Sequence, residues 1–163
     1  MDYKNFLDSL DKRLNEYFEL HKEHINCCLG CSSCCETGDY PMSQIELEYL
    51  MQGYAQLSDK DKVTVQNNIK NIVKGGACPF LIDKKCSVYA FRPVICRVHG
   101  LAYLCAGDVV KVPYCANEGK NYNKVYKDGE IEINPIKENL DTQNLLKDFN
   151  FGEIRNLIDW INH

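Results

Sequence analysis

The 163-residue chain lacks the features that mark several large classes of protein. No apolar run approaches the roughly 20 residues that a membrane-spanning helix needs, so we expect no membrane partner. The chain opens with MDYKNFLDSLDKRLNEYFEL, which has no uninterrupted apolar stretch and no small-residue cleavage site, and we therefore expect a cytoplasmic protein. A formal net charge of −4 argues against a general phosphate-binding surface and hence against nucleic acid as a partner.

Signs of internal division and of common enzymes are also missing. No fixed-period repeat, low-complexity stretch or long Pro/Gly/Ser linker interrupts the chain, which favours one domain over residues 1–163. There is no G-x-G-x-x-G fingerprint, P-loop, G-x-S-x-G elbow or H-E-x-x-H motif. The sequence therefore leaves open whether the protein is an enzyme.

What the sequence has in abundance is cysteine. Five of its ten cysteines fall within the nine-residue run CCLGCSSCC. They are Cys27, Cys28, Cys31, Cys34 and Cys35. Two thiolates at C-x2-C spacing can bind one soft cation together, because a two-residue turn brings both sulfurs to the same side of the chain.

Three explanations compete for these thiols. Disulfides require an oxidising compartment, which the absence of an export signal argues against. Inert buried cysteines pack as small hydrophobes, but neighbours such as Cys34 and Cys35 rarely face the same core. Metal ligation is the explanation that we favour, with the other two left open.

Five further cysteines follow at wider intervals. Cys78, Cys86, Cys96, Cys105 and Cys115 recur at gaps of 8, 10, 9 and 10 residues, too wide for zinc-knuckle pairs. Each must come from a different loop, and only tertiary structure can bring them to the first group. A helical hairpin between residues 35 and 78 would return the chain.

The apolar pattern predicts a mainly helical protein. Residues 6–18 form one apolar stripe at three- and four-residue steps. Capping boxes precede two more helical patterns, with Ser43 and Glu46 before the first and Ser58 and Asp61 before the second, which Gly75 and Gly76 should end.

Short β-hairpins should contribute the remaining regular structure. One is predicted between residues 101–105 and 109–114, and another between residues 125–127 and 130–133 around an Asp-Gly turn. A helix should open at Pro135 and run to about Asp148, and residues 151–161 give a closing amphipathic helix. We expect a small single α+β domain, mainly α with minor β, whose helices pack around a loop-borne cysteine metal site.

At this point the cysteine motifs resemble a known family. Cys28-x2-Cys31-x2-Cys34-Cys35, then CPFL from Cys78, then CSVYAFRPVICR from Cys86 to Arg97 are similar to the YkgJ-type cysteine-cluster family, a zinc- or iron-chelating domain. The match covers about residues 27–100. It implies that the motif cysteines bind metal and that Arg92, Pro93 and Arg97 are companion positions. The implied ligands are Cys28, Cys31, Cys34, Cys35, Cys78, Cys86 and Cys96. Cys105 and Cys115 are further candidate ligands in a more variable tail, and Cys27 lies outside the pattern.

The sequence admits two kinds of metal centre. An iron–sulfur cluster such as [4Fe–4S] needs four thiolates, as does a tetrahedral zinc site, and the surplus here suggests two sites or spare thiols. The family is similar, in this module, to a flagellin lysine methylase thought to carry an iron–sulfur cluster, which favours iron. Arg92 and Arg97 would donate charge and N–H groups to the sulfurs, although a structural salt bridge is an alternative for Arg92. His99 is a weaker ligand candidate.

Three functions fit these observations. The first is a metal- or cluster-binding protein that serves as an accessory or carrier in a modification or redox system. The second is a small metal- or cluster-dependent enzyme for redox or group transfer. The third is a structural zinc domain that presents a surface to a protein partner, whose identity the sequence does not reveal.

Overall fold

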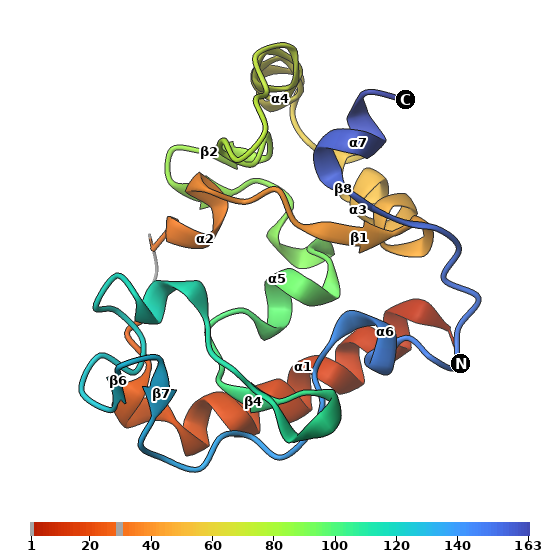
Figure 1. Cartoon of the computed structure of the whole chain (residues 1–163). Helices are drawn as coiled ribbons and strands as arrows, with labels where there is room; N and C mark the ends of the chain where they lie inside the picture. The colour runs from red at the N-terminus through yellow and green to blue at the C-terminus, as the bar shows by residue number, and fades with distance from the viewer. Residues whose placement is uncertain (1, 29–30) are drawn as a thin grey trace. The chain divides into compact units, whose positions relative to one another are not determined.

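The computed structural model describes residues 2–28 and 31–163, and it is mainly helical with short antiparallel strands (Figure 1). The predicted α+β class with minor β content is therefore confirmed. The chain forms two compact units, one of residues 1–28 and 97–145 and the other of residues 29–96 and 146–163. Within the described ranges, no helix is both long enough and apolar enough to cross a bilayer.

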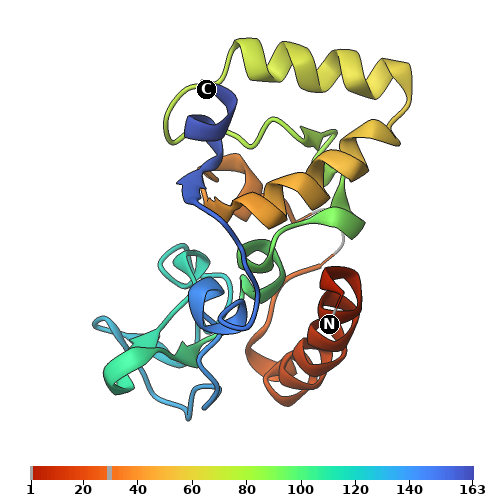
Figure 2. The same ribbon diagram turned by 90° about the vertical axis from the view of Figure 1, so that its right-hand side faces the viewer.

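The unit of residues 29–96 and 146–163 carries most of the cysteines. Its helical elements are α2 (Ser33–Glu36), α3 (Gln44–Ala55), α4 (Asp59–Lys70), the 3-10 turn η2 (Tyr89–Phe91), the start of α5 (Val94–Val98), and α7 (Leu157–Ile161). Its strands are β1 (Pro41–Ser43), which pairs with β8 (Ile154–Asn156), and β2 (Leu81–Ile82), which pairs with β3 (Lys85–Cys86). Figure 2 shows α3 and α4 following each other across a short turn.

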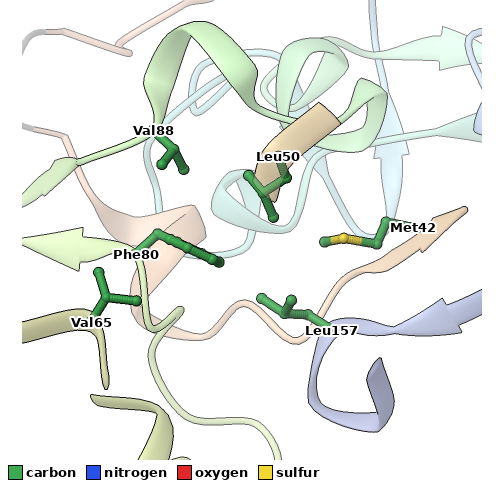
Figure 3. Packing of buried hydrophobic residues seen from close by; sticks show 6 residues of the cluster. All are labelled: Met42, Leu50, Val65, Phe80, Val88 and Leu157. Carbon is green, nitrogen blue, oxygen red and sulfur yellow. The ribbon is translucent and has the colours of Figure 1, made fainter. Parts of the chain in front are cut away.

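The core of this unit draws one side chain each from β1, α3, α4 and α7, and two more from the segments just before β2 and η2 (Figure 3). The buried cluster consists of Met42, Leu50, Val65, Phe80, Val88 and Leu157. Partly buried Cys78 and Cys86 pack against it. Burial of such side chains supplies the main stabilising free energy, so the core and these two thiols are held by the same packing.

Both predicted helix starts of this unit are confirmed. Ser43 and Glu46 form the capping box of α3, and the Ser58 hydroxyl accepts a 3.1 Å hydrogen bond from the Asp61 N–H at the start of α4. The predicted end is wrong, because α4 stops at Lys70 rather than near Gly75. Of the apolar residues in α4 only Val65 is fully buried, so little packing holds a further turn.

The other unit is built on α1 (Tyr3–Leu20). Of the predicted stripe, Leu7, Leu10 and Leu14 are buried, while Phe6, Tyr17 and Phe18 are half-buried; Tyr3, outside the predicted stripe, is also buried. Its other helical elements are η1 (Lys22–His24), η3 (Ala106–Asp108), η4 (Tyr114–Ala116) and α6 (Thr142–Leu145). Its strands are β4 (Tyr103–Leu104), β5 (Val110–Lys111), β6 (Tyr126–Lys127) and β7 (Glu130–Ile131).

The two predicted hairpins are confirmed. β4 pairs with β5, and β6 pairs with β7, both antiparallel. Asp128 and Gly129 have φ values of 51° and 84°, the left-handed backbone that a tight two-residue hairpin turn requires. The Asp-Gly pair is therefore the local cause of the second hairpin.

The predicted helices near the C-terminus are wrong in extent. Only residues 142–145 of the expected 135–148 segment are α-helical, because Ile136 instead pairs with Tyr103 in a parallel bridge. Residues 154–156 of the expected closing helix form strand β8 against β1, and only residues 157–161 are helical. In both segments tertiary pairing overrides helical periodicity.

Candidate metal centre

Two distant cysteine regions meet in the unit of residues 29–96 and 146–163. The Cys78 N–H donates a 2.7 Å hydrogen bond to the Cys35 carbonyl, although α3 and α4 lie between them in sequence. Cys34 and Cys35 lie on α2 rather than in a loop. The helices between residues 35 and 78 thus return the chain as the sequence suggested.

A tight hairpin positions Cys78 and Cys86. The Phe80 carbonyl accepts hydrogen bonds from the Ser87 N–H at 2.9 Å and the Ser87 hydroxyl at 2.8 Å. The register places Cys86 opposite Leu81 in the β2–β3 pair. Main-chain N–H groups two residues further on donate to both sulfurs, Phe80 to Cys78 and Val88 to Cys86. Donors of this kind favour thiolate, the form that binds metal.

Helix α5 brings Cys96 to the same region. Pro93 precedes the helix, and the Val94 N–H donates a 2.9 Å hydrogen bond to the Oε1 atom of buried Glu46. The same carboxylate accepts hydrogen bonds from the N–H and hydroxyl of Ser43. Glu46 therefore fixes the start of α5, and with it Cys96, on α3.

Electrostatic coupling shows that five thiols share one neighbourhood. Burial raises the pKa of Cys78 to about 11 and raises the pKa values of Cys86 and Cys96 above the ordinary value. In each of the three, negative charge on neighbouring thiols raises the pKa further. A group of thiolates that repel one another is stabilised by a bound cation.

Cys34 and Cys35 behave as a pair. A hydrogen bond from the Cys35 thiol lowers the pKa of Cys34 to about 7, with the N–H groups of both residues adding to this effect. The same bond, followed by burial, raises the pKa of Cys35. One sulfur of the pair is thus readily ionised near neutral pH, as a metal ligand must be.

Arg92 is a cationic group beside these thiols. Its positive charge lowers the pKa values of Cys86 and Cys96 against the larger effect of burial. Its guanidinium carbon lies 3.8 Å from the ring centroid of exposed Tyr89, and its Nη1 atom donates to the Tyr89 carbonyl at 2.9 Å. The Tyr89 ring and carbonyl thus hold the Arg92 guanidinium in place, and its predicted role toward the sulfurs stays a prediction.

Several other candidates lie in the unit of residues 1–28 and 97–145. Arg97 is buried and its Nη1 atom pairs with the Asp11 carboxylate, and burial lowers the pKa of His99. Cys115 is buried in η4. Cys28 belongs to this unit, and Cys31 to the other; both are exposed. The ligand roles predicted for these residues stay predictions.

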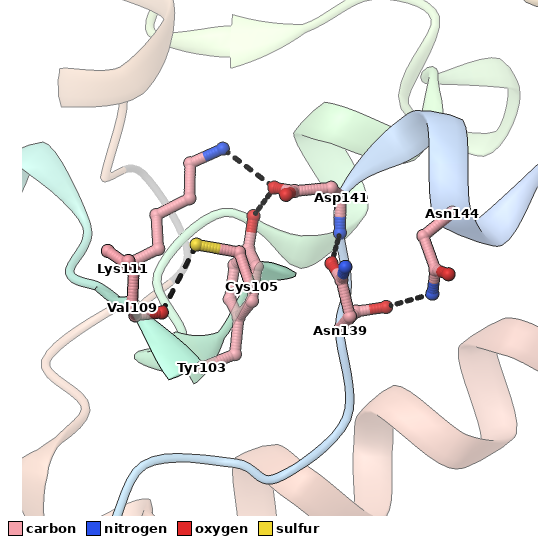
Figure 4. Close-up of polar contacts among 7 residues, drawn as sticks. All are labelled: Tyr103, Cys105, Val109, Lys111, Asn139, Asp141 and Asn144. Atoms are coloured by element: carbon pink, nitrogen blue, oxygen red, sulfur yellow. Dashed lines mark hydrogen bonds and ion pairs between the residues drawn. The ribbon is translucent and has the colours of Figure 1, made fainter. Parts of the chain in front are cut away.

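Cys105 lies in a polar cluster at the β4–β5 hairpin (Figure 4). Its thiol donates to the Val109 carbonyl at 3.1 Å. Beside it, the Asp141 carboxylate accepts hydrogen bonds of 2.9 Å from the Tyr103 hydroxyl and from Lys111 Nζ. Burial, the Asp141 bond and the nearby Cys105 charge raise the pKa of Tyr103. These contacts account for Cys105 within its own hairpin.

The five-thiol cluster has the donor chemistry of a soft-metal site. Its members are Cys34, Cys35, Cys78, Cys86 and Cys96. Thiolates bind zinc and iron–sulfur clusters in preference to magnesium or calcium. Within residues 2–28 and 31–163, no three His, Cys, Asp or Glu side chains are already positioned around one metal point.

Sequence reasoning missed the long-range contacts of three residues, Glu46, Asn121 and Tyr122, that help to position the cysteine-bearing segments. The capping box predicted the role of Glu46 in α3, but nothing local predicted its bond to Val94. The buried residues Asn121 and Tyr122, which contact the chain near Cys27, gave no signal because isolated Asn and Tyr residues carry no motif.

Comparison with known proteins returned one family. The model of the CxxCxxCC family, described as "Putative zinc- or iron-chelating domain", matches residues 27–128. The match includes all ten cysteines and extends past the motifs that end at Arg97. No curated protein and no solved structure matched the chain.

Proposed function

The chain belongs to the CxxCxxCC family of zinc- or iron-chelating domains, and from that premise we propose that its five-thiol cluster holds an iron–sulfur cluster, with zinc as the alternative. Cys34, Cys35, Cys78, Cys86 and Cys96 supply the ligands. Cys28 and Cys31, which complete the C-x2-C-x2-C-C motif, are the next candidates.

One observation carries this proposal. The chain segments that carry Cys34–Cys35, Cys78–Cys86 and Cys96 belong to one compact unit, and a 2.7 Å hydrogen bond joins the first two of them through the Cys78 N–H and the Cys35 carbonyl. In this unit, negative charge on one thiol raises the pKa values of others. Main-chain N–H groups donate to three of these sulfurs, and Arg92 adds positive charge beside two of them. Buried thiols that repel one another on ionisation would destabilise the fold, whereas a bound cation turns the same arrangement into a stabilising one.

The arrangement is compatible with both metals, because tetrahedral zinc and a [4Fe–4S] cluster each use four thiolates, which the five-thiol cluster can supply. The similarity of this module to a flagellin lysine methylase thought to carry an iron–sulfur cluster favours iron. Hydrogen bonds to sulfur, together with burial, are also the means by which proteins tune iron–sulfur reduction potentials. We therefore place iron–sulfur first.

The biological role that we propose is that of an accessory or carrier in a modification or redox system. The surplus of thiols supports this role over that of a purely structural zinc domain. A structural zinc site needs only four thiolates, and the chain has more cysteines than that. A small metal- or cluster-dependent enzyme is the second candidate. The lowered pKa of Cys34, about 7, favours that candidate, since a thiol that ionises near neutral pH can act as a nucleophile.

The test is elemental analysis of anaerobically purified protein, with its absorption spectrum. Iron and sulfide in matching amounts, with absorption near 400 nm (about the range of iron–sulfur charge transfer), would support the first assignment. Colourless protein with stoichiometric zinc would replace it with the second.

Matched variants test the ligand set. Cys86→Ser and Cys96→Ser should lower metal content and stability together, because binding free energy is coupled to folding. Cys105→Ser is the control, since Cys105 is bonded within its own hairpin, and it should retain the metal. Full metal retention in both Cys86→Ser and Cys96→Ser would refute the proposed centre.

A further inference from the structure

Cys27 lies in a cradle made by residues far from it in sequence. The Asn121 side-chain amide donates to Cys27 Sγ at 3.1 Å and to the Gly100 carbonyl at 2.9 Å, while its oxygen accepts the Asn26 N–H at 2.8 Å. Gly100 has a φ of 101°, and a Cβ there would lie 3.2 Å from Cys27 Sγ. Asn121 is almost fully buried, so these contacts fix the sulfur and are not an incidental surface encounter.

The main chain of Cys115 is hydrogen-bonded to residues 120–122, the same segment whose Asn121 contacts Cys27. Its carbonyl accepts the Lys120 N–H at 3.1 Å, and the Lys120 carbonyl accepts the Asn26 side-chain amide at 2.6 Å. The segments that carry Cys27 and Cys115 are therefore both anchored to residues 120–122. Both belong to the unit of residues 1–28 and 97–145.

The buried Tyr122 hydroxyl lies near both thiols. Burial raises the pKa of Tyr122 to about 12, and negative charge on Cys27 and on Cys115 raises it further. The hydroxyl accepts the Ala102 N–H at 3.0 Å and lies 2.8 Å from His21 Nδ1. Two thiols from distant parts of the sequence thus both act electrostatically on one buried hydroxyl whose position is fixed by hydrogen bonds.

The two thiols differ in exposure, as the attacking and the resolving thiol of a redox-active pair commonly do. Cys27 is exposed, whereas Cys115 is only 6% exposed. Redox-active cysteine pairs commonly combine an accessible attacking thiol with a second thiol that resolves the intermediate.

We propose that Cys27 and Cys115 form a redox-active dithiol, separate from the five-thiol cluster, that exchanges with low-molecular-weight disulfides. The Cys27 thiolate attacks one sulfur of the small disulfide, which forms a mixed disulfide and releases one small thiolate. The Cys115 thiolate then attacks Cys27 Sγ, forms the Cys27–Cys115 disulfide and releases the second small thiolate. Two protein thiols are oxidised, the small disulfide is reduced to two thiols, and each small thiolate takes up a proton that a cysteine gave up.

The experiment uses the full chain in anaerobic glutathione buffers of graded ratio, followed by alkylation and tryptic peptide mapping. Tryptic cleavage places Cys27 in residues 23–60 and Cys115 in residues 112–120. We expect these two peptides to be joined, with the loss of two hydrogen atoms, as the buffer becomes oxidising. Cys27→Ser should abolish the link and Cys28→Ser, the adjacent exposed thiol, should leave it intact.

Asn121→Asp provides a second readout. Aspartate retains an acceptor for the Asn26 N–H but loses the donor to Cys27 Sγ and adds repulsion against the thiolate, so linkage should slow by about tenfold. A persistent link in Cys27→Ser, or no link in the unmodified chain at any glutathione ratio, overturns the proposal.

Metal content separates this proposal from the first. Cys27→Ser and Cys115→Ala should keep the metal, whereas Cys96→Ser should lose it and still form the link. Metal loss from Cys27→Ser or Cys115→Ala in folded protein would show that these residues are ligands and would also overturn the dithiol.

Discussion

Substitution of Glu46 is the sharpest test of how the fold holds the cluster. The Glu46 side chain is only 1% exposed, and its carboxylate accepts the Ser43 N–H at 2.7 Å, the Ser43 hydroxyl at 2.7 Å and the Val94 N–H at 2.9 Å. Glu46→Ala leaves two main-chain N–H groups without this acceptor. Each unsatisfied buried donor costs about 1–3 kcal/mol, so we expect a loss of about 4 kcal/mol in the free energy of unfolding.

The matched control is Glu48→Ala on the same helix. Glu48 is exposed, and Gln44 donates to it at 2.9 Å. Because both variants replace Glu by Ala within α3, the difference in helix propensity cancels. Glu48→Ala should change the free energy of unfolding by about 0.5 kcal/mol or less.

The assay is urea unfolding followed by fluorescence of Trp160, the single tryptophan, which lies in the same unit and donates to the Met42 carbonyl at 3.0 Å. Metal content is measured in parallel, and it should fall in Glu46→Ala because the start of α5 is released from α3. A Glu46→Ala protein within about 1 kcal/mol of Glu48→Ala would refute the reasoning, since two orphaned N–H groups cost more than that.

Three further predictions follow from local geometry. Gly100→Ala should lower the free energy of unfolding by about 2–3 kcal/mol, because the new Cβ would lie 3.0 Å from Asn121 Nδ2. The control Gly119→Ala also has a positive φ, of 70°, but its Cβ would meet open space, so it should cost about 1 kcal/mol in the same urea assay. Arg92→Gln removes a positive charge that lowers the pKa values of Cys86 and Cys96, so both pKa values should rise. Metal analysis during acidification should therefore show that this variant releases its metal at a higher pH than the surface control Arg155→Gln does. Burial lowers the pKa of His21 below its ordinary 6.5, so the unfolded chain binds more protons below that pH. Stability should therefore fall as pH drops through about 6.5, and the fall should be smaller in His21→Gln; equal pH slopes in the two proteins would contradict this.

Local signals predicted the elements that local physics determines. The α1 stripe, the two capped helix starts and the Asp128-Gly129 hairpin depend on side chains within a few residues of one another. The C-terminal helices failed because residues 154–156 pair with β1, more than a hundred positions earlier, and periodicity contains no information on such a partner.

The candidate site likewise combines features that the sequence predicted with features that depend on long-range contacts. The family resemblance offered all five thiols of the cluster among nine candidate ligands, but nothing in the sequence showed which of the nine lie together. Their convergence depends on the Cys35–Cys78 main-chain bond and on the hydrogen bond between Glu46 and Val94. Cys27 lies outside the family motif, so the resemblance implies no role for it. Its contacts with Asn121 and Gly100 are long-range, and only the folded chain shows them.

The sulfurs of Cys78 and Cys86 receive their hydrogen bonds from main-chain N–H groups of Phe80 and Val88. A donor that belongs to the backbone survives the exchange of one core side chain for another at positions 80 and 88, so the charge environment of the sulfurs persists while the packing changes. Proline is the exception, because it has no N–H to donate. Because both side chains are buried in the core, homologues should vary at these two positions only among apolar residues that fill the same space, and should avoid proline.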